Sequence, residues 1–377
     1  MKWFIPRPDT YIGSIEIRNK TIFGVTIKMI RRITIFVLAV IFAVSAVAHH
    51  STTHFSPDVS EMRGVLVDLH WRNPHVYFFL ETVEENGETK TWEMEAGTIY
   101  MIGRAGVTRD LFTVGDTIRV AGNKSEVYDD KFWVENILTA EGIEVAVTAG
   151  NEPYFTNALI GGRNQWTNEA FVQNGSASEG NGIYRVWSPP NAEFSTRLTG
   201  DPENNINDIA TAASLEAGSS FDPYSFDAAC ELPGMPRVNH GPHPHQFVED
   251  GDNILFVAEE FYITRTIHMN SDVDPETVPH SSLGFSKGHW QDENTLIVET
   301  TRINYPYMNL GGIGQSENVR MYEKYVLAAE ENRLDFEVII TDPGMITEPL
   351  VERGVWLDIG ETVDETYDCI PKELASE

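Results

Sequence analysis

Basic residues are scarce in this chain. Its 377 residues include 27 lysines and arginines against 57 aspartates and glutamates, which gives a formal net charge of −30. Such an excess of negative charge repels nucleic acids and anionic membrane surfaces, so we exclude both as partners. The acidic residues are dispersed over many segments and indicate a solvated surface. Cations and small neutral molecules remain as candidate partners.

Cysteine is also scarce, because Cys230 and Cys369 are the only two in the chain. There is no CxxC pair and no zinc-ribbon spacing, which excludes the common cysteine-based metal sites. In an oxidising compartment the two thiols are expected to pair, and the bridge would tie together the two ends of the C-terminal half. The alternative is two free, buried thiols.

Long apolar runs are missing as well. The longest one, Ile33–Val44, continues through small residues to Ala48 and stays short of the roughly 20 residues that a membrane-spanning helix needs. It follows a cluster of basic residues and ends in the A-x-A triplet Ala46–Ala48. This pattern predicts a secretory signal peptide over residues 29–48, with a retained anchor as the alternative.

A start at Met29 gives the signal peptide a normal length, so residues 1–28 are interpreted as a start codon assigned too early. Cleavage after Ala48 would leave a mature chain with no stable membrane insertion. We expect it to be periplasmic or secreted, in a Gram-negative-type bacterium.

Residues 49–147 have the pattern of a small β domain. Three strands, a short helix and two further strands follow one another, which is the order of an OB-like five-stranded barrel. Alternation of Val65, Val67 and Leu69 predicts that these three side chains share one face of the first strand. The expected strands cover residues 65–69, 76–80, 89–95, 117–121 and 131–139, with a helix over 98–106.

The remainder of the chain is also predicted to be mostly β. Residues 148–195 are rich in Gly, Asn, Ser and Pro and read as an irregular linker. Residues 196–377 begin with a short helix over 208–217 and then favour a larger antiparallel barrel or sandwich, with a lipocalin-like barrel around a ligand cavity as the preferred form. The expected strands cover 254–258, 262–269, 285–290, 295–300, 319–327, 334–340 and 351–359.

Histidines at the mature N-terminus form the first candidate site. After cleavage, the α-amino nitrogen and imidazole of His49 would chelate one metal ion, and His50 and His54 follow closely. His75 lies at the start of the expected second strand, within reach of the chain that enters the barrel. Imidazole ligands favour copper or zinc. The alternative is a solvated N-terminus that binds nothing specific.

A second histidine cluster lies at His240, His243 and His245, interleaved with Pro242 and Pro244. If this segment is a strand, His243 and His245 face the same side and form a pair of metal ligands. Proline argues against a central strand, so a polar loop at the barrel rim is the alternative.

Gly284-Phe-Ser286-Lys-Gly288 matches the G-x-S-x-G pattern of serine hydrolases. That mechanism requires a strand, a sharp turn and a helix around the serine. Here a polar turn and another strand follow, so the pattern favours glycines that permit a β-bulge or close strand packing.

Charges also occur in the expected barrel strands, at Glu259, Glu260, Arg265 and Glu299. Side chains of this kind that point inward would pair with one another or with a ligand, and two carboxylates can act as acid and base.

Two parts of the chain resemble uncharacterised families of exported proteins. Residues 48–147 resemble a small exported bacterial domain of unknown function, through Ala48–Ser51, Trp71–His75 and Gly115–Gly122. Residues 183–371 resemble a second group of uncharacterised exported proteins. The shared stretches are Cys230–Arg237, Arg265–His268, Gly284–Trp290, Thr295–Thr300, Asp342–Pro343 and Cys369. The second resemblance supports the disulfide, whereas His240, His243 and His245 do not fit its pattern.

Together these features predict an exported protein that binds a small molecule or a metal ion and is not catalytic. The alternatives are a metal-dependent redox enzyme that uses His49, a hydrolase in the C-terminal part, and an envelope assembly factor. The expected ligand-binding residues are Glu260, Arg265, His268 and His289. The expected ligands for copper or zinc are His49, His50, His54, His75, His243 and His245.

Overall fold

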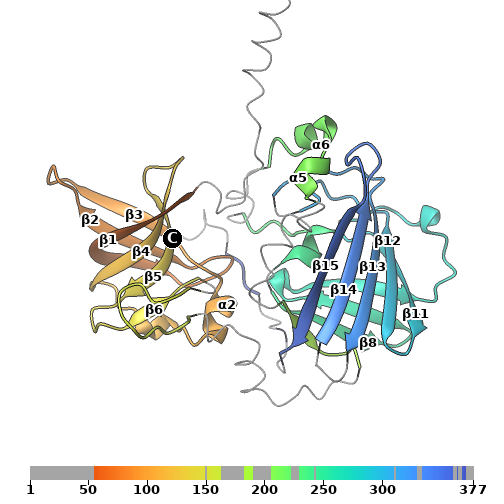
Figure 1. Ribbon diagram of the computed structural model, residues 1–377, viewed down its shortest axis with the longest axis horizontal. Coiled ribbons are helices and arrows are strands. Elements are labelled where there is room, and N and C mark those ends of the chain that lie inside the picture. The colour runs from red at the N-terminus through yellow and green to blue at the C-terminus, as the bar shows by residue number, and fades with distance from the viewer. Residues whose placement is uncertain are drawn as a thin grey trace, which may run out of the picture. The chain divides into compact units, whose positions relative to one another are not determined.

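A computed structural model describes most of the chain from Phe55 onward, within the compact unit Ala48–Glu377 (Figure 1). The predicted signal peptide and His49, His50 and His54 lie outside the described residues. The described residues are 55–148, 151–162, 182–189, 205–221, 229–241, 243–309, 311–328, 333–359, 363 and 367–370.

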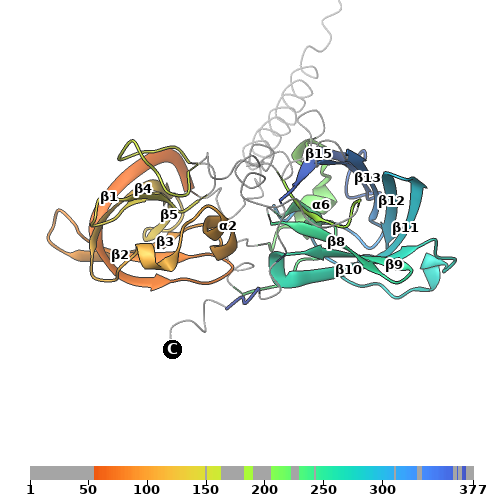
Figure 2. The ribbon, with the colours of Figure 1, turned by 90° about the horizontal axis from the view of Figure 1, so that it is seen from below.

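The N-terminal sheet closes into a small barrel, as predicted (Figure 2). Its strand order is β3-β2-β1-β4-β5-β6, and a further pairing of β3 with β5 completes the ring in the order of an OB-like fold. The elements are β1 (Phe55–His70), β2 (Tyr77–Val83), β3 (Thr89–Glu95), α2 (Ile99–Arg104), η1 (Arg109–Leu111), β4 (Thr117–Ser125), β5 (Lys131–Leu138) and β6 (Glu144–Ala146).

The predicted face of β1 is wrong because the strand contains a bulge. Its register against β2 shifts between Leu66 and Asp68, so the two-residue alternation changes side. Leu66 and Leu69 are buried, whereas Val67 is 39% exposed.

Helix α2 places Arg104 near the second barrel. Thr98 caps the helix by accepting the N–H of Met101 at 3.2 Å. Ile102 is fully buried in the core of the first barrel and fixes the helix against it. Arg104, at the end of the helix, therefore has a defined position.

The C-terminal part is a closed barrel of nine strands, ordered β10-β11-β12-β13-β14-β15-β7-β8-β9. Eight of the pairings are antiparallel, and β10 pairs with β11 in parallel. An odd number of strands can close a ring only with at least one parallel pair. The strands are β7 (Val186–Ser188), β8 (His245–Asp250), β9 (Asn253–Ala258), β10 (Ile263–Met269), β11 (Phe285–Asp292), β12 (Thr295–Thr301), β13 (Arg320–Ala328), β14 (Arg333–Thr341) and β15 (Leu350–Asp358).

The barrel takes one strand from the predicted linker. β7 lies inside residues 148–195 and joins β8 to β15, which corrects the expectation of an irregular segment up to residue 195. A strand of three residues is too short to produce a periodic pattern. The core explains its position, because Trp187 is completely buried in the barrel interior.

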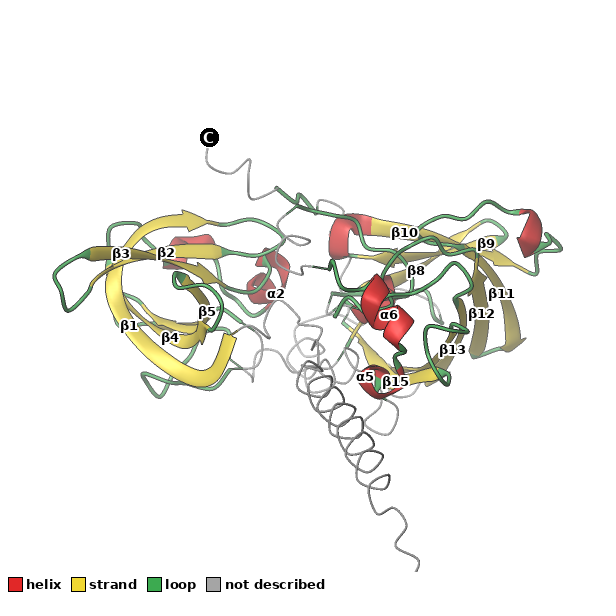
Figure 3. Cartoon of the chain, turned by 90° about the horizontal axis from the view of Figure 1, so that it is seen from above, coloured by secondary structure: helices red, strands yellow, loops and turns green. Residues whose placement is uncertain are grey.

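Helices are few and short (Figure 3). The helix expected over 208–217 is two helices, α5 (Ile206–Ile209) and α6 (Ala212–Ala217), capped by Asn205 and Thr211. The remaining 3-10 turns of the barrel are η4 (Arg237–His240), η5 (Glu260–Tyr262) and η6 (Pro275–Thr277). No helix among the described residues is long and apolar enough to cross a membrane.

The predicted disulfide is present, and Cys230 and Cys369 are joined at an S–S distance of 2.02 Å. Next to it, Cys369 forms a β-bridge with Asn73 of the first barrel. The N–H of Ile370 donates to the Asn73 carbonyl at 3.3 Å. The bridge therefore holds the last described segment of the chain on the Trp71–His75 stretch.

Candidate functional site

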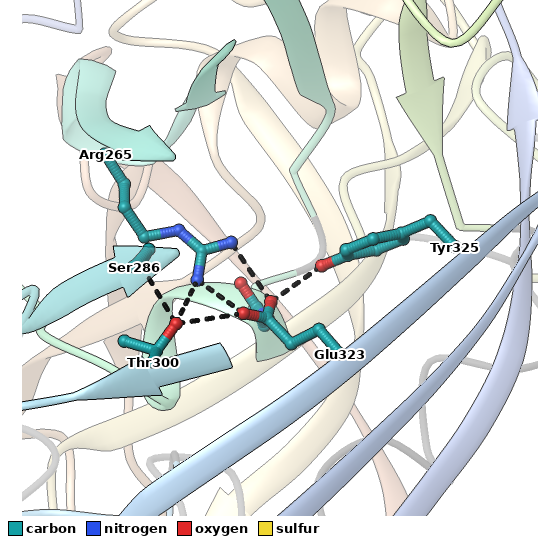
Figure 4. A network of polar contacts seen from close by, with 6 residues as sticks. Arg265, Ser286, Thr300, Glu323 and Tyr325 are labelled. Carbon is teal, nitrogen blue, oxygen red and sulfur yellow. Dashed lines mark hydrogen bonds and ion pairs between the residues drawn. The ribbon is translucent and has the colours of Figure 1, made fainter. Parts of the chain in front are cut away.

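A buried group of polar side chains lies inside the C-terminal barrel (Figure 4). We call it the interior polar cluster. Neighbouring strands supply most of its members, and η4 supplies one. Its members are Asn239 (η4), Arg265 (β10), Ser286 (β11), Thr300 (β12), Glu323 and Tyr325 (β13).

Strand alternation directs these side chains inward. On β13, Met321, Glu323 and Tyr325 are buried while the residues between them are partly exposed. On β10, Arg265 lies on the same face of the strand as the buried Ile263 and Ile267. Charged and apolar side chains thus share the interior face of the barrel.

Glu323 is the centre of the cluster. Arg265 forms a bidentate ion pair with it, with Nη1 2.7 Å from Oε2 and Nη2 3.0 Å from Oε1. Asn239 Nδ2 and the Tyr325 hydroxyl each donate to Oε1 at 2.8 Å. The Thr300 hydroxyl donates to Oε2 at 3.2 Å. The carboxylate therefore accepts five hydrogen bonds without contact with solvent.

The hydroxyl chain extends outward from Glu323. Because Thr300 donates its proton to Glu323, its oxygen accepts from Arg265 Nη1 at 3.3 Å and from the Ser286 hydroxyl at 2.9 Å. The cluster thus has a single consistent assignment of donors and acceptors along this chain.

Electrostatics keep the central pair ionised. Burial raises the pKa of Glu323, but the charge of Arg265 and the hydrogen bonds to the carboxylate outweigh it, so the pKa is lowered. Burial lowers the pKa of Arg265, and the adjacent carboxylate more than reverses this effect. Burial and the Glu323 charge raise the pKa of Tyr325, which remains a neutral donor.

Two buried atoms of the cluster have no hydrogen-bond partner among the described residues. They are Arg265 Nε, a donor, and Asn239 Oδ1, an acceptor. Both residues donate to the same oxygen, Glu323 Oε1. Buried polar groups are nearly always paired, and an unpaired one costs about 1–3 kcal/mol. An unpaired donor and an unpaired acceptor, on two residues that bond to the same carboxylate oxygen, are therefore the notable feature of this site.

Several aromatic rings pack beside the cluster, in a core that also contains many aliphatic side chains. The guanidinium of Arg265 lies 4.8 Å from the centroid of Phe256, within cation–π range. His245 stacks on Phe256 at 5.0 Å and on Trp356 at 4.8 Å. Tyr325 lies between Phe247 and Trp356, at 5.2 and 5.7 Å. The site combines polar and aromatic surfaces.

More polar groups gather where η4 and η5 meet. Arg237 Nη2 lies 3.8 Å from Glu260 Oε1, and both side chains are largely buried. Burial raises the pKa of Tyr305 nearby, and its buried hydroxyl has no hydrogen-bond partner. Charges on this end of the barrel are again balanced in pairs.

Glu259 forms a second buried ion pair, with Arg104. Arg104 Nη1 and Nη2 lie 2.8 and 2.6 Å from the two carboxylate oxygens. Burial raises the pKa of Glu259, but Arg104 and His243 outweigh this effect and lower the pKa to about 2. His243 Nδ1 lies 3.9 Å from Glu259 Oε1, too far for a hydrogen bond.

The predicted ligand-binding residues do not converge. Arg265 lies in the interior polar cluster, and Glu260 lies at η5 beside Arg237. His268 stacks on Phe285 at 4.8 Å, on the opposite side of β10 from Arg265. His289 is exposed. Glu299, named above among the charges of the expected strands, is exposed too.

The predicted metal ligands that the structure describes also lie apart. His75 Nδ1 is 2.7 Å from the Ala96 carbonyl in the first barrel. His243 is buried near Glu259, and His245 begins β8 within the aromatic stack. The described residues contain no group of three or more His, Cys, Asp or Glu side chains that could hold a metal ion.

The G-x-S-x-G stretch is part of a strand and not of a nucleophile elbow. Ser286 is buried in β11 and bonds to Thr300. A Cβ atom added to Gly288 would lie 2.5 Å from Ile267 Cγ2 and 2.6 Å from Met269 Sδ. The glycine thus allows β11 to pack closely on β10, as the alternative interpretation proposed.

Sequence reasoning missed Glu323, Asn239, Thr300 and Tyr325. The signal for Glu323 and Tyr325 was the alternation with Met321 in an otherwise apolar strand face. Asn239 carried no such signal, because a four-residue 3-10 turn has no period that assigns a face.

A hollow of about 430 Å³ on the first barrel is a weaker candidate. Glu144, its one acidic lining residue, already accepts the N–H groups of Tyr154, Phe155 and Thr156 and the Asn136 amide. The carboxylate fixes a loop there and has little capacity left for a ligand.

Part of the chain is similar to a known protein family. Residues 37–129 match a family of unknown function, DUF6152. The match covers β1 to β4 of the first barrel, where a resemblance to an uncharacterised domain was predicted. No curated protein matches the chain.

The first prediction concerns the coupling of Arg265 and Glu323. Glu323→Gln should destabilise the protein by about 3–5 kcal/mol, because it leaves a buried arginine without its counterion. The double variant R265M/E323M should lose less stability than either R265M or E323M. Urea denaturation of all four variants measures this. If the stability lost in R265M/E323M equals the sum of the losses in R265M and E323M, the coupling is contradicted.

The second prediction concerns acid stability. The pKa of Glu259 is depressed to about 2 from 4.5, so its stabilisation is full above pH 4.5 and is lost as the pH falls toward 2. The contribution amounts to roughly 3 kcal/mol. Arg104→Met should lower stability at pH 7 and flatten the dependence between pH 4.5 and 2, measured by urea denaturation at several pH values. If stability falls as steeply between pH 4.5 and 2 in Arg104→Met as in the parent protein, the attribution of this pH dependence to the Arg104–Glu259 pair is refuted.

Proposed function

We propose that this chain is an exported protein that binds a small neutral molecule in its C-terminal barrel and is not an enzyme. The observation that carries this proposal is the pair of unpaired buried atoms in the interior polar cluster, Arg265 Nε and Asn239 Oδ1. A ligand that accepts from the first and donates to the second would complete the cluster.

The charge balance favours a neutral ligand. Arg265 is compensated by Glu323, Arg104 by Glu259, and Arg237 by Glu260. A charged ligand would leave one of these buried pairs with an excess charge, which is costly in a site of low dielectric. Hydroxyl groups satisfy both unpaired atoms, and the aromatic rings offer surface to the apolar faces of a sugar-like or polyol ligand.

Two further features support export, namely the predicted signal peptide and the disulfide, which fits an oxidising compartment. The lack of convergence among acid, base and nucleophile candidates in the described residues supports binding without catalysis. Ser286 bonds to a threonine, and the carboxylate of Glu323 is saturated with donors.

The third prediction tests ligand binding. Glucose, as a probe rich in hydroxyls, should raise the thermal midpoint of the mature protein by about 2 °C or more near saturation, whereas the dication putrescine should not raise it. Asn239→Leu should abolish the response. Native mass spectrometry of the purified protein should also detect a retained neutral molecule.

Tyr325→Phe is the matched control for Asn239→Leu. Both variants remove one 2.8 Å donor to Glu323 Oε1, but only Asn239→Leu deletes the unpaired acceptor. Tyr325→Phe should keep the response to glucose. Equal loss in both variants, or no retained molecule and no response to any probe, would refute ligand binding.

A metal site at the mature N-terminus is the second candidate, and one observation favours it. The Ala96 carbonyl can only accept, so His75 Nδ1 is the donor and Nε2 is the basic nitrogen. Metal-bound histidines commonly have this arrangement. Phe55, at the start of β1, and His75 both pack on the ring of Trp133. The ring centroids lie 6.1 Å apart for Phe55 and 6.2 Å apart for His75.

The fourth prediction tests this metal site. The mature chain that begins at His49 should bind about one equivalent of copper more tightly than the same chain with one added N-terminal methionine. His75→Gln should weaken binding by roughly 10-fold or more, since it removes one imidazole ligand. Isothermal titration in the presence of a competing chelator measures the affinities. Equal affinity of the native and extended chains would exclude the site.

A further inference from the structure

Arg72, in the first barrel, has an unfilled guanidinium edge. Its Nε and Nη2 atoms are both buried and have no hydrogen-bond partner among the residues that the structure describes. These two N–H groups form the side-on fork of the guanidinium, whose spacing matches the two oxygens of a carboxylate. The fork is thus a donor pair without an acceptor.

Three other arginines of the protein each direct two guanidinium nitrogens to a carboxylate. On the same barrel, Arg119 Nε and Nη2 lie 2.9 and 2.7 Å from Glu61 Oε1. Arg104 and Arg265 each form a bidentate pair with a glutamate. In a chain with 57 aspartates and glutamates, an arginine fork that lacks a carboxylate requires an explanation.

The electrostatics of Arg72 agree with a missing anion. Burial lowers the pKa of Arg72, and the charges of Tyr77 and Glu93 oppose this effect only in part. The Glu93 carboxylate is directed to Lys131, whose Nζ lies 2.8 Å from Oε2. A partly buried cation without a contacting anion is destabilising, and a bound anion would relieve this cost.

Asn73, the residue after Arg72, also has buried side-chain atoms without a hydrogen-bond partner among the described residues. Asn73 is fully buried, and both its Nδ2 and its Oδ1 lack a partner. Its backbone holds Cys369 and Ile370 in place. Two consecutive residues of the Trp71–His75 stretch therefore offer buried donors that the described part of the protein does not use.

We propose that Arg72 anchors a carboxylate-binding site on the first barrel, and that the amide of Asn73, the next residue in the chain, supplies a further donor. The guanidinium fork takes the two carboxylate oxygens. This site is separate from the neutral-ligand site proposed for the second barrel and does not depend on it. The carboxylate has two sources, a small carboxylic acid in solution or the acidic tail that follows Ile370 in the sequence, which includes Glu373 and Glu377.

The fifth prediction distinguishes these sources with sodium succinate as the probe, against sodium chloride at matched ionic strength. For a small-acid site, succinate should raise the thermal midpoint of the mature chain by about 2 °C or more. Arg72→Met should remove the response and raise the midpoint without succinate, because it removes an uncompensated charge. Arg119→Met, the control with a filled fork, should keep the response.

If the tail fills the site, the mature chain should not respond, but a chain that ends at Ile370 should, and Arg72→Met should remove that response. Either pattern supports a carboxylate site. The proposal is overturned if neither chain responds, or if Arg72→Met responds as strongly as the parent chain. A response to glucose, with no response to succinate in either the mature or the shortened chain, would leave the barrel site standing and remove this one.

Discussion

The buried pair of Arg265 and Glu323 is the constraint around which the second barrel is arranged. Placing two charges in a barrel interior is costly unless every lone pair of the carboxylate finds a donor. The structure meets this condition with side chains from β10, β12, β13 and η4. A slip of one residue in β13 would turn Glu323 outward and leave Arg265 unpaired. The pair therefore fixes the register of the strands and the position of η4.

Regular strand patterns made much of this fold predictable. β13 and β14 alternate buried and exposed residues along their length, and both were expected within one or two residues. Local departures from alternation were not predictable in the same way. The bulge in β1 moves the buried side from Val67 to Leu66, and β7 is too short to show a period. β10 and β11 pair in parallel because the whole ring closes with an odd number of strands. The local sequence pattern of either strand carries no information about this closure.

The candidate site was harder to predict than the fold. A site depends on which face of its strand each side chain occupies and on which distant residues it contacts. Arg265 and His268 are three residues apart on one strand, so alternation alone places them on opposite faces, as the structure does. His243 and His245 would share a face only if the strand covered both, and β8 begins at His245. Asn239 reaches Glu323 across 84 residues of sequence, a separation that no spacing rule connects.

Arg265 and Arg72 represent two different uses of a buried guanidinium. In Arg265 the end-on edge is filled by an internal carboxylate, and the buried Nε–H, which lacks a partner among the described residues, suits a neutral acceptor. In Arg72 the whole side-on fork lacks an acceptor among the described residues, and the charge has no contacting counterion. The same side chain therefore favours opposite ligand charges in the two barrels, because what an arginine can bind is set by which of its edges the protein has already filled.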